Sequence, residues 1–424
     1  MKRYVTIVLF ICMVLVPSII FAQGADDVTI TIFSRWSTDI PGDVYFREHL
    51  TKMSESDNGI TIIQEHMNDE MSYYDKLRTR FATGEFPNVF VDYGGARTLD
   101  YVSSGILVDM KPYLDADPAW RDAFMPVFDK WIYDKYPGIW GVPAEFYAVS
   151  IFYNKEIFAG VGVEPPKTIA EFEEVCDKLL AAGYIPLALG ERDVWRAGHF
   201  SNNLIMKTFG AQGVTDLANR MLAYDSPEII STFAKIKEYY NRGYFGPSPV
   251  NMDYNMEKAA FHTGKSAMHM DGSWYLGEGT QSSIGDVMGV FPFPSINKKY
   301  TNSWQGGAGG GFSIVDTGNQ KEIDAAVKVL KSITTPEYMK ELQRVNKGGV
   351  YPIKFDPDPS AVDNLTLEYI AMLEDAEEFR DDVQTYDLLP SLLETVRLSI
   401  QGLFAGKTPE ECASEIVAEI SANE

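Results

Sequence analysis

The stretch "VTITIFSRW" (Val28–Trp36) sets the expected fold class, because its β-branched residues favour an extended strand. Two similar stretches follow it, "GITIIQEH" (Gly59–His66) and "PNVFVDYGG" (Pro87–Gly95). Helical stretches are expected between them, near residues 44–55 and 72–83. This strand–helix–strand order predicts a parallel sheet built from βαβ units, and hence an α/β fold.

Open sheets of this kind bind ligands beyond the carboxyl ends of their strands. In this chain those ends carry Trp36, Asp39, Asp92 and Tyr93. These four residues are therefore the first candidates for a binding site.

The residues before the first strand have the layout of a secretory signal peptide, which we expect to span residues 1–24. Two basic residues precede an uncharged run that ends in small residues, and cleavage is expected between Ala22 and Ala25. An uncleaved membrane anchor is the alternative, since the run is long enough to span a bilayer. The small residues at its end and Pro17 favour cleavage. Cys12 follows Ile11 and not a small residue, so the chain is not an obvious lipoprotein.

The 424 residues suffice for two domains, each with its own core. The formal net charge of −23 would become −25 once Lys2 and Arg3 are removed with the signal peptide. Such an acidic chain is a poor partner for nucleic acid, which requires basic patches. Cys176 and Cys412 both fall on predicted helices, which favours two buried free thiols and leaves one disulfide open.

Strands and helices continue to alternate along the rest of the chain. Thr168 and Glu171 form a capping box, and Thr335 precedes Pro-Glu, a second helix start. Further short strands are expected at residues 185–189, 266–271 and 287–293. With no flexible linker visible, the chain is expected to cross between its domains more than once.

The motifs for nucleotide, metal or nucleophile chemistry are incomplete. Gly264-Lys265-Ser266 resembles the end of a phosphate loop, but Ala259 stands where that loop needs glycine, and a strand follows. The histidines lack paired ligand spacing, and no serine lies in a nucleophile elbow. The sequence thus predicts no cofactor and no metal. A secreted glycoside hydrolase or lyase could still assemble carboxylates from distant segments, although nothing nominates a pair.

Aromatic residues lie in or beside loops that also carry polar residues. A sugar packs its C–H face on a flat ring while its hydroxyl groups need donors and acceptors, so this mixture favours a carbohydrate ligand. The aromatic candidates are Trp36, Tyr93, Trp195, Trp274 and Trp304. The tryptophans at 120, 131 and 140 lie among apolar residues and are assigned to packing.

Four segments resemble the family 1 extracellular solute-binding proteins of ABC transporters, in the family's order along the chain. They are "GVPAEFYAVSIFYNKEIF" (Gly141–Phe158), "PPKTIAEFEEVCDKL" (Pro165–Leu179), "FHTGKSAMHMDGSW" (Phe261–Trp274) and "LFAGKTPEECASEI" (Leu403–Ile416). The resemblance implies a type II periplasmic-binding fold, with two α/β lobes and a ligand cleft between them. It places the N-terminal lobe at residues 25–145 plus 312–335, and the C-terminal lobe at residues 146–311 plus 336–424. In "WQGGAGGGFSI" (Trp304–Ile314), the glycines 309–311 would then form part of the hinge: Gly309, Gly310 and Gly311.

The carbohydrate-binding branch of that family is the closer match, because Trp274 and Tyr93 fall where sugar-binding relatives place aromatic contacts. The segment from Trp195 to His199 also resembles one that faces ligand. Maltose-binding relatives carry aromatics just ahead of the C-terminal helices, whereas this chain has Leu392-Leu393, which favours a smaller or different sugar. The full set of expected ligand contacts is Trp36, Asp39, Asp92, Tyr93, Glu145, Tyr147, Trp195, His199, Asp271, Trp274, Trp304 and Gly307.

The function that the resemblance implies is that of a non-enzymatic receptor, expected to be a monomer in the periplasm. It would bind a mono- or short oligosaccharide and deliver it to the permease subunits of an ATP-driven importer. The same fold binding a polyol, a polyamine or an anion remains the alternative.

Overall fold

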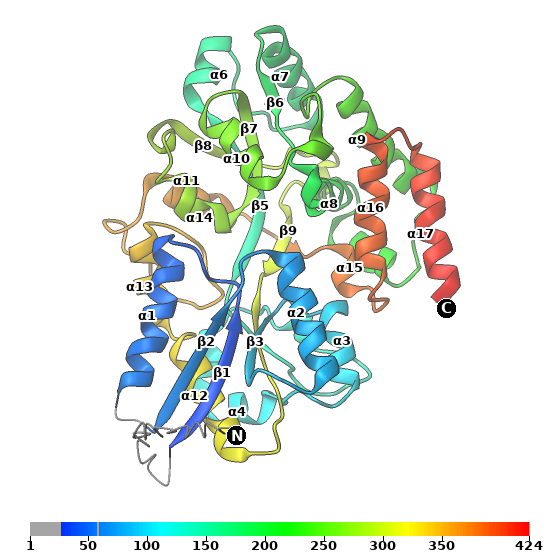
Figure 1. Ribbon diagram of the computed structural model, residues 1–424. Helices are drawn as coiled ribbons and strands as arrows, with labels where there is room; N and C mark the ends of the chain where they lie inside the picture. Colours follow the sequence, from blue (N-terminus) through cyan, green and yellow to red (C-terminus); the bar gives the residue numbers. More distant parts are fainter. Residues whose placement is uncertain (1–26, 57–58, 424) are drawn as a thin grey trace, which may run out of the picture.

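The computed structural model describes residues 27–56 and 59–423, which form two α/β lobes joined near the middle of the molecule (Figure 1). The predicted signal peptide lies outside the described residues. Among the helices that are described, none is long and apolar enough to cross a membrane.

The first sheet has the strand order β2-β1-β3-β10-β4. Strands β1 to β3 run parallel, which confirms the βαβ prediction, whereas β10 runs antiparallel to both β3 and β4. Its strands are β1 (Val28–Ser34), β2 (Ile60–His66), β3 (Val89–Asp92), β4 (Val142–Pro143) and β10 (Gly311–Ile314).

The helices of the first lobe contribute to the core of this sheet, where Leu50, Leu77 and Leu330 are all fully buried. They are α1 (Pro41–Glu55), α2 (Glu70–Thr83), α3 (Ala96–Ser103), α4 (Lys111–Ala116), α5 (Pro118–Ala123), α12 (Gln320–Ser332) and α13 (Pro336–Asn346).

The second sheet has the order β11-β9-β5-β7-β6, with β8 also paired to β5. Its central strand β5 is antiparallel to β7, β8 and β9, whereas β6 is parallel to β7 and β11 is parallel to β9, so this sheet is mixed. The strands are β5 (Phe146–Asn154), β6 (Ile185–Leu187), β7 (Ser266–Gly272), β8 (Met288–Pro292), β9 (Ser303–Ala308) and β11 (Glu378–Arg380).

Helices cover the second sheet and extend to the C-terminus (Figure 1). The buried thiols of Cys176 and Cys412 are both free and belong to the core that these helices share. The helices are α6 (Lys155–Val161), α7 (Ile169–Ala181), α8 (Trp195–Ala218), α9 (Pro227–Asn241), α10 (Tyr254–His262), α11 (Leu276–Gly279), α14 (Asn364–Glu374), α15 (Val383–Tyr386), α16 (Leu392–Phe404) and α17 (Pro409–Asn423).

The chain passes between the sheets three times: the third passage lies between α13 and α14, and the first two passages are close together in space. It leaves β4 at Pro143 and enters β5 at Phe146, then leaves β9 at Ala308 and enters β10 at Gly311. These two passages are bonded to each other, because the backbone N–H groups of Ala144 and Glu145 both donate to Gly310 O, at 3.0 and 2.9 Å.

The sequence-based division differs from the packing for helix α13. Residues from 336 onward were expected in the C-terminal lobe, yet Tyr338 and Met339 are buried in the core of the first sheet. The Tyr338 ring lies 5.1 Å from that of Tyr45 on α1. The N-cap Thr335 and Pro336 correctly predict the start of the helix, but capping residues carry no information about which core the helix joins.

Candidate functional site

Four aromatic side chains of the second lobe lie together; we call Tyr147, Trp195, His199 and Trp274 the aromatic platform. The Trp274 ring centroid lies 5.4 Å from that of Tyr147, 5.8 Å from that of His199 and 6.2 Å from that of Trp195. Trp274 keeps 40% of its surface exposed, although the other three residues pack against it. An exposed indole supported on several sides is a rigid face for a ligand.

Three different elements position the aromatic platform. Trp274 lies in the 3-10 turn η4 (Ser273–Tyr275) directly after β7, and Tyr147 lies on β5, which pairs with β7. Trp195 and His199 begin α8 and are four residues apart, so they share one face of the helix. Regular secondary structure therefore holds every member.

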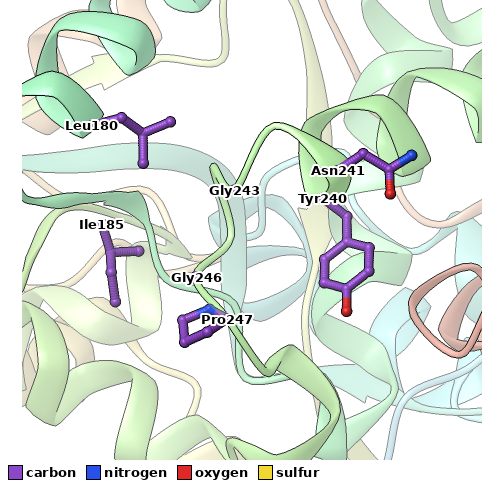
Figure 2. A pocket seen from close by; sticks show the side chains of 7 residues that line it. All are labelled: Leu180, Ile185, Tyr240, Asn241, Gly243, Gly246 and Pro247. Carbon is purple, nitrogen blue, oxygen red and sulfur yellow. The ribbon is translucent and has the colours of Figure 1, made fainter.

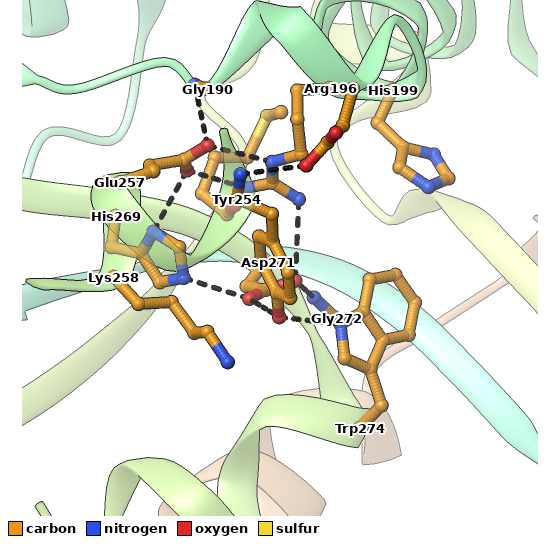
Figure 3. Close-up of polar contacts among 12 residues, drawn as sticks. Gly190, Arg196, His199, Tyr254, Glu257, Lys258, His269, Asp271, Gly272 and Trp274 are labelled. Carbon is orange, nitrogen blue, oxygen red and sulfur yellow. Dashed lines mark hydrogen bonds and ion pairs between the residues drawn. The ribbon is translucent and has the colours of Figure 1, made fainter. Parts of the chain in front are cut away.

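A buried charge network of Arg196, Glu257, His269 and Asp271 lies beside Trp274 and His199 of the aromatic platform (Figure 3). Arg196 pairs with Glu257 at 2.6 Å and with Asp271 at 3.4 Å. His269 lies between the same two carboxylates, with Nδ1 at 2.9 Å from Glu257 and Nε2 at 2.7 Å from Asp271. All four side chains are fully buried, so each charge depends on the others for its stabilisation.

Tyr254 connects the buried charge network to the aromatic platform. Its hydroxyl donates to Asp271 Oδ2 at 2.6 Å and accepts from the indole Nε1 of Trp274 at 3.3 Å. Its ring lies edge-on to Trp195, with centroids 5.1 Å apart. The orientation of both tryptophans is thus set by hydrogen bonds and packing that begin in the core.

The network shifts the pKa values of its members. Burial alone would raise the pKa of Asp271, but Arg196 and His269 lower it to about 2. Burial would also lower the pKa of His269, yet Asp271 and Glu257 outweigh that effect and raise it above its ordinary value of 6.5.

We expect His269 to make stability depend on pH. Because its pKa is raised in the folded state, its contribution is complete below pH 6.5 and is lost as the pH rises through the folded value. The free energy of unfolding of wild-type protein should therefore fall from pH 6.5 upward relative to that of His269→Gln. Urea unfolding at several pH values measures this difference, and parallel pH profiles for the two proteins would contradict the assignment.

A second polar group lies at the carboxyl ends of the first-lobe strands. It consists of Arg35, Glu70, Tyr93 and Arg97, and we call it the first-lobe group. Arg35 donates to the Tyr93 hydroxyl at 2.8 Å and pairs with Glu70 at 3.1 Å, while Arg97 pairs with the other oxygen of Glu70 at 2.9 Å. Burial would raise the pKa of Glu70, but Arg97 and Arg35 lower it to about 2, assisted through space by Arg397 of α16. Since Arg397 belongs to the second lobe, the two lobes approach each other at this place.

The passage between the lobes joins the two groups. Glu145 accepts from Trp36 Nε1 at 3.2 Å and from Gly310 N at 2.9 Å. Gly307 pairs with Tyr147 in the sheet, has a φ of +134°, and faces open space on its Cβ side. Both Glu145 and Gly307 therefore lie between the first-lobe group and the aromatic platform.

Four of the predicted ligand contacts lie outside the aromatic platform, the first-lobe group and the residues between them. Asp39 is exposed on the loop after β1. Asp92 accepts from Gly94 N, Ser313 Oγ and Trp131 Nε1, and Asp271 belongs to the buried charge network, so neither carboxylate faces solvent. Trp304 was expected to offer a stacking face but is only 3% exposed, with the Lys207 ammonium 5.2 Å from its ring centroid.

Gln305, the residue next to Trp304, is also buried, but it contacts the aromatic platform. Successive side chains of a strand point to opposite faces, so Gln305 points away from the Trp304 ring. The Gln305 amide donates to His199 Nδ1 and to Asp382 Oδ1. The sequence showed Gln305 next to Trp304 on an expected strand, but it did not show which of the two faces the aromatic platform.

The hinge glycines differ in their surroundings. A Cβ on Gly311 would lie 2.4 Å from the carbonyl oxygen of Val142, so the close approach of β10 to β4 requires glycine there. A Cβ on Gly310 would instead meet the end of the Glu145 side chain, at 2.7 Å. A hinge function for Gly309 and Gly310, which lie between β9 and β10, stays a prediction.

A hollow of about 510 Å³ lies elsewhere on the second lobe, beside α7, β6 and α9 (Figure 2). Ile185 in its wall pairs with Ser266 at the start of β7, whereas Trp274 follows the end of that strand. At 3.3 Å per residue, the six steps of strand from Ser266 to Gly272 separate the two positions by about 20 Å. The hollow is lined by Leu180, Ile185, Tyr240, Asn241, Gly243, Gly246 and Pro247.

The fold and the site together define a protein of two α/β lobes, with an aromatic platform on one lobe and a charged group on the other. The chain belongs to the bacterial extracellular solute-binding proteins, whose family model matches residues 54–340. The similarity to solved structures identifies the fold as the type II periplasmic-binding fold.

Several individual proteins are similar to this chain. A probable sugar-binding periplasmic protein of Mesorhizobium japonicum is 24% identical over 81% of this chain and 82% of its own length. A maltotriose-binding protein of Pyrococcus abyssi is 28% identical over 63% of this chain, and this match spans only 55% of that relative. The structure of a chitin oligosaccharide binding protein superposes with a TM-score of 0.85 and 26% identity, covering 94% of this chain and 99% of that one.

Proposed function

We propose that the protein is the receptor of an ABC importer and binds a neutral mono- or short oligosaccharide between its lobes. The observation that carries this proposal is the aromatic platform, in which a partly exposed Trp274 is held by Tyr147, Trp195 and His199. Such a face suits the C–H surface of a sugar ring, and the neighbouring polar groups suit its hydroxyls. The names of the similar proteins support the same ligand class.

The charges around the proposed site argue against the two charged solute classes, the polyamines and the anions. In the first-lobe group, Arg35 and Arg97 are offset by Glu70 and by Glu145 beside it. A polyamine or a strongly anionic ligand would need an excess of one sign. The balanced charges instead allow charge-assisted hydrogen bonds to uncharged hydroxyls.

The proposal also covers the location of the protein in the cell and the proteins that it binds. The predicted signal peptide would carry the protein out of the cytoplasm, where a monomer with closed lobes would dock on the permease subunits. Catalysis is not part of this function, since the family is one of binding proteins. Incubation with oligosaccharides should therefore produce no new reducing ends.

A thermal-shift screen tests the ligand class. The panel comprises triacetylchitotriose, maltotriose and raffinose, with spermidine and sulfate as the charged alternatives. A sugar at 100 times its Kd should stabilise the fold by about 2.7 kcal/mol and raise the Tm by roughly 3–6 °C. Shifts with spermidine or sulfate alone would contradict the proposal.

A further inference from the structure

Lys130 lies in the 3-10 turn η1 (Asp129–Trp131) and joins the first lobe to the passage between the lobes. Its carbonyl oxygen accepts from Gly95 N at 2.6 Å, which fixes its backbone to the turn after β3. Its side chain is 4% exposed and donates to the carbonyl oxygens of Ala308 and Gly309, at 3.0 and 3.4 Å. The third acceptor of the ammonium group is the carboxylate of Asp381.

Asp381 directly follows β11 in the second lobe, so its ion pair with Lys130 links the two lobes. One of its carboxylate oxygens binds Lys130, and the other accepts from the Tyr147 hydroxyl and from Asp382 N. Tyr147 is a member of the aromatic platform, with its ring 5.4 Å from that of Trp274. A continuous chain of contacts thus runs from the interlobe passage to the platform.

The chemistry of the contacts from Lys130 through Asp381 to Tyr147 favours a positioning role for them over a purely stabilising one. Removing two charges from water opposes folding, so a buried ion pair often stabilises no better than apolar side chains of similar volume. Fixed charges do impose a direction, because the three N–H donors of a lysine and the oxygens of a carboxylate must each meet a partner. The pair therefore specifies how the Tyr147 ring is oriented relative to the passage.

We propose that Lys130 and Asp381 are positioning residues, which couple the angle between the lobes to the orientation of Tyr147 at the ligand. Rotation of the lobes alters the backbone at Ala308 and Gly309, whose carbonyls hold the Lys130 ammonium. A shift of these carbonyl groups moves the Lys130 ammonium, and Asp381 passes this movement on to the Tyr147 hydroxyl. The Tyr147 ring is therefore oriented for ligand binding at only one angle between the lobes. This inference rests on the proposed sugar site.

A double-mutant cycle on sugar affinity tests the coupling. Calorimetry with triacetylchitotriose, maltotriose and raffinose compares wild type with Tyr147→Phe, Lys130→Met and the double variant. We expect Kd to rise about 5-fold for Tyr147→Phe and about 10-fold for Lys130→Met, as for the loss of one hydrogen bond. The Kd of the double variant should rise by no more than about 10-fold, because both substitutions break the same series of contacts.

The matched control is Lys207→Met. Lys207 is also buried, but its ammonium donates to Thr301 O at 2.7 Å and lies over Trp304, so this variant should keep the wild-type Kd. Tyr147→Phe retains the ring and is expected to fold, so it tests the inference even if Lys130→Met does not fold. An unchanged Kd for Tyr147→Phe, or a 50-fold rise for the double variant, would overturn the coupling.

A second cycle separates this inference from the proposed function. The midpoints of urea unfolding of the same variants, without sugar, should also be non-additive, since the contacts exist in the unliganded protein. If no sugar binds wild type, or if Trp274→Ala binds like wild type, the proposed site is wrong, and the positioning role fails with it. If Trp274→Ala strongly weakens binding while the midpoint shifts simply add, the site stands and the coupling alone is refuted.

Discussion

Replacing Trp274 by Ala is expected to weaken sugar binding by roughly 30- to 1,000-fold, the largest effect of any single change on affinity. Truncation of a tryptophan at the centre of a binding site typically costs about 2–4 kcal/mol, and each 1.4 kcal/mol is tenfold in Kd. The fold should persist, because the side chain is 40% exposed and its neighbours are anchored from the core. Calorimetry with the panel sugars measures the loss.

Trp274→Phe is the matched control for that substitution. It keeps an aromatic face for the sugar but removes the indole N–H that donates to Tyr254. We expect Phe to recover most of the affinity lost in Ala. Equal losses for Phe and Ala would show that the ring face is not what the ligand contacts.

Arg196→Met should give the largest loss of stability, about 3–5 kcal/mol in the free energy of unfolding. The substitution leaves Glu257 and Asp271 fully buried without their guanidinium partner. One remaining cation, a protonated His269, cannot balance two carboxylates. Urea unfolding monitored by circular dichroism measures the change.

Two further variants distinguish this mechanism from lost packing. Adding Glu257→Gln to Arg196→Met should recover part of the stability, because one of the uncompensated charges is removed. Arg344→Met breaks an exposed pair with Glu341 and should leave the unfolding transition unchanged. Failure of the double variant to recover would indicate that Arg196 acts mainly through its volume.

Local structure follows closely from the sequence. The expected strand at Val28–Trp36 is β1 (Val28–Ser34), and the capping box at Thr168 starts α7 as predicted. Both depend on interactions within a few residues, namely β-propensity and side-chain bonds to free backbone N–H groups. The passage near Gly309–Gly311 was also expected, although from the family resemblance.

The site itself was only partly visible in the sequence. Trp274, Trp195 and His199 were selected for their polar surroundings, and they do lie together in the structure. Arg35, Glu70 and Arg97 were missed, because they come from separate elements and meet only when the sheet forms. Arg35 directly precedes Trp36 at a strand end, so this one member could have been found.

The sequence by itself determined the elements, the α/β class and the aromatic candidates, because these depend on local propensity and residue type. Only the tertiary structure decided which candidates are accessible. Trp304 and Trp274 look alike in the sequence, yet one is buried beneath Lys207 and the other is 40% exposed. Likewise, α13 joins the first lobe and Asp271 pairs with Arg196, because burial and ion pairing depend on residues that are distant along the chain.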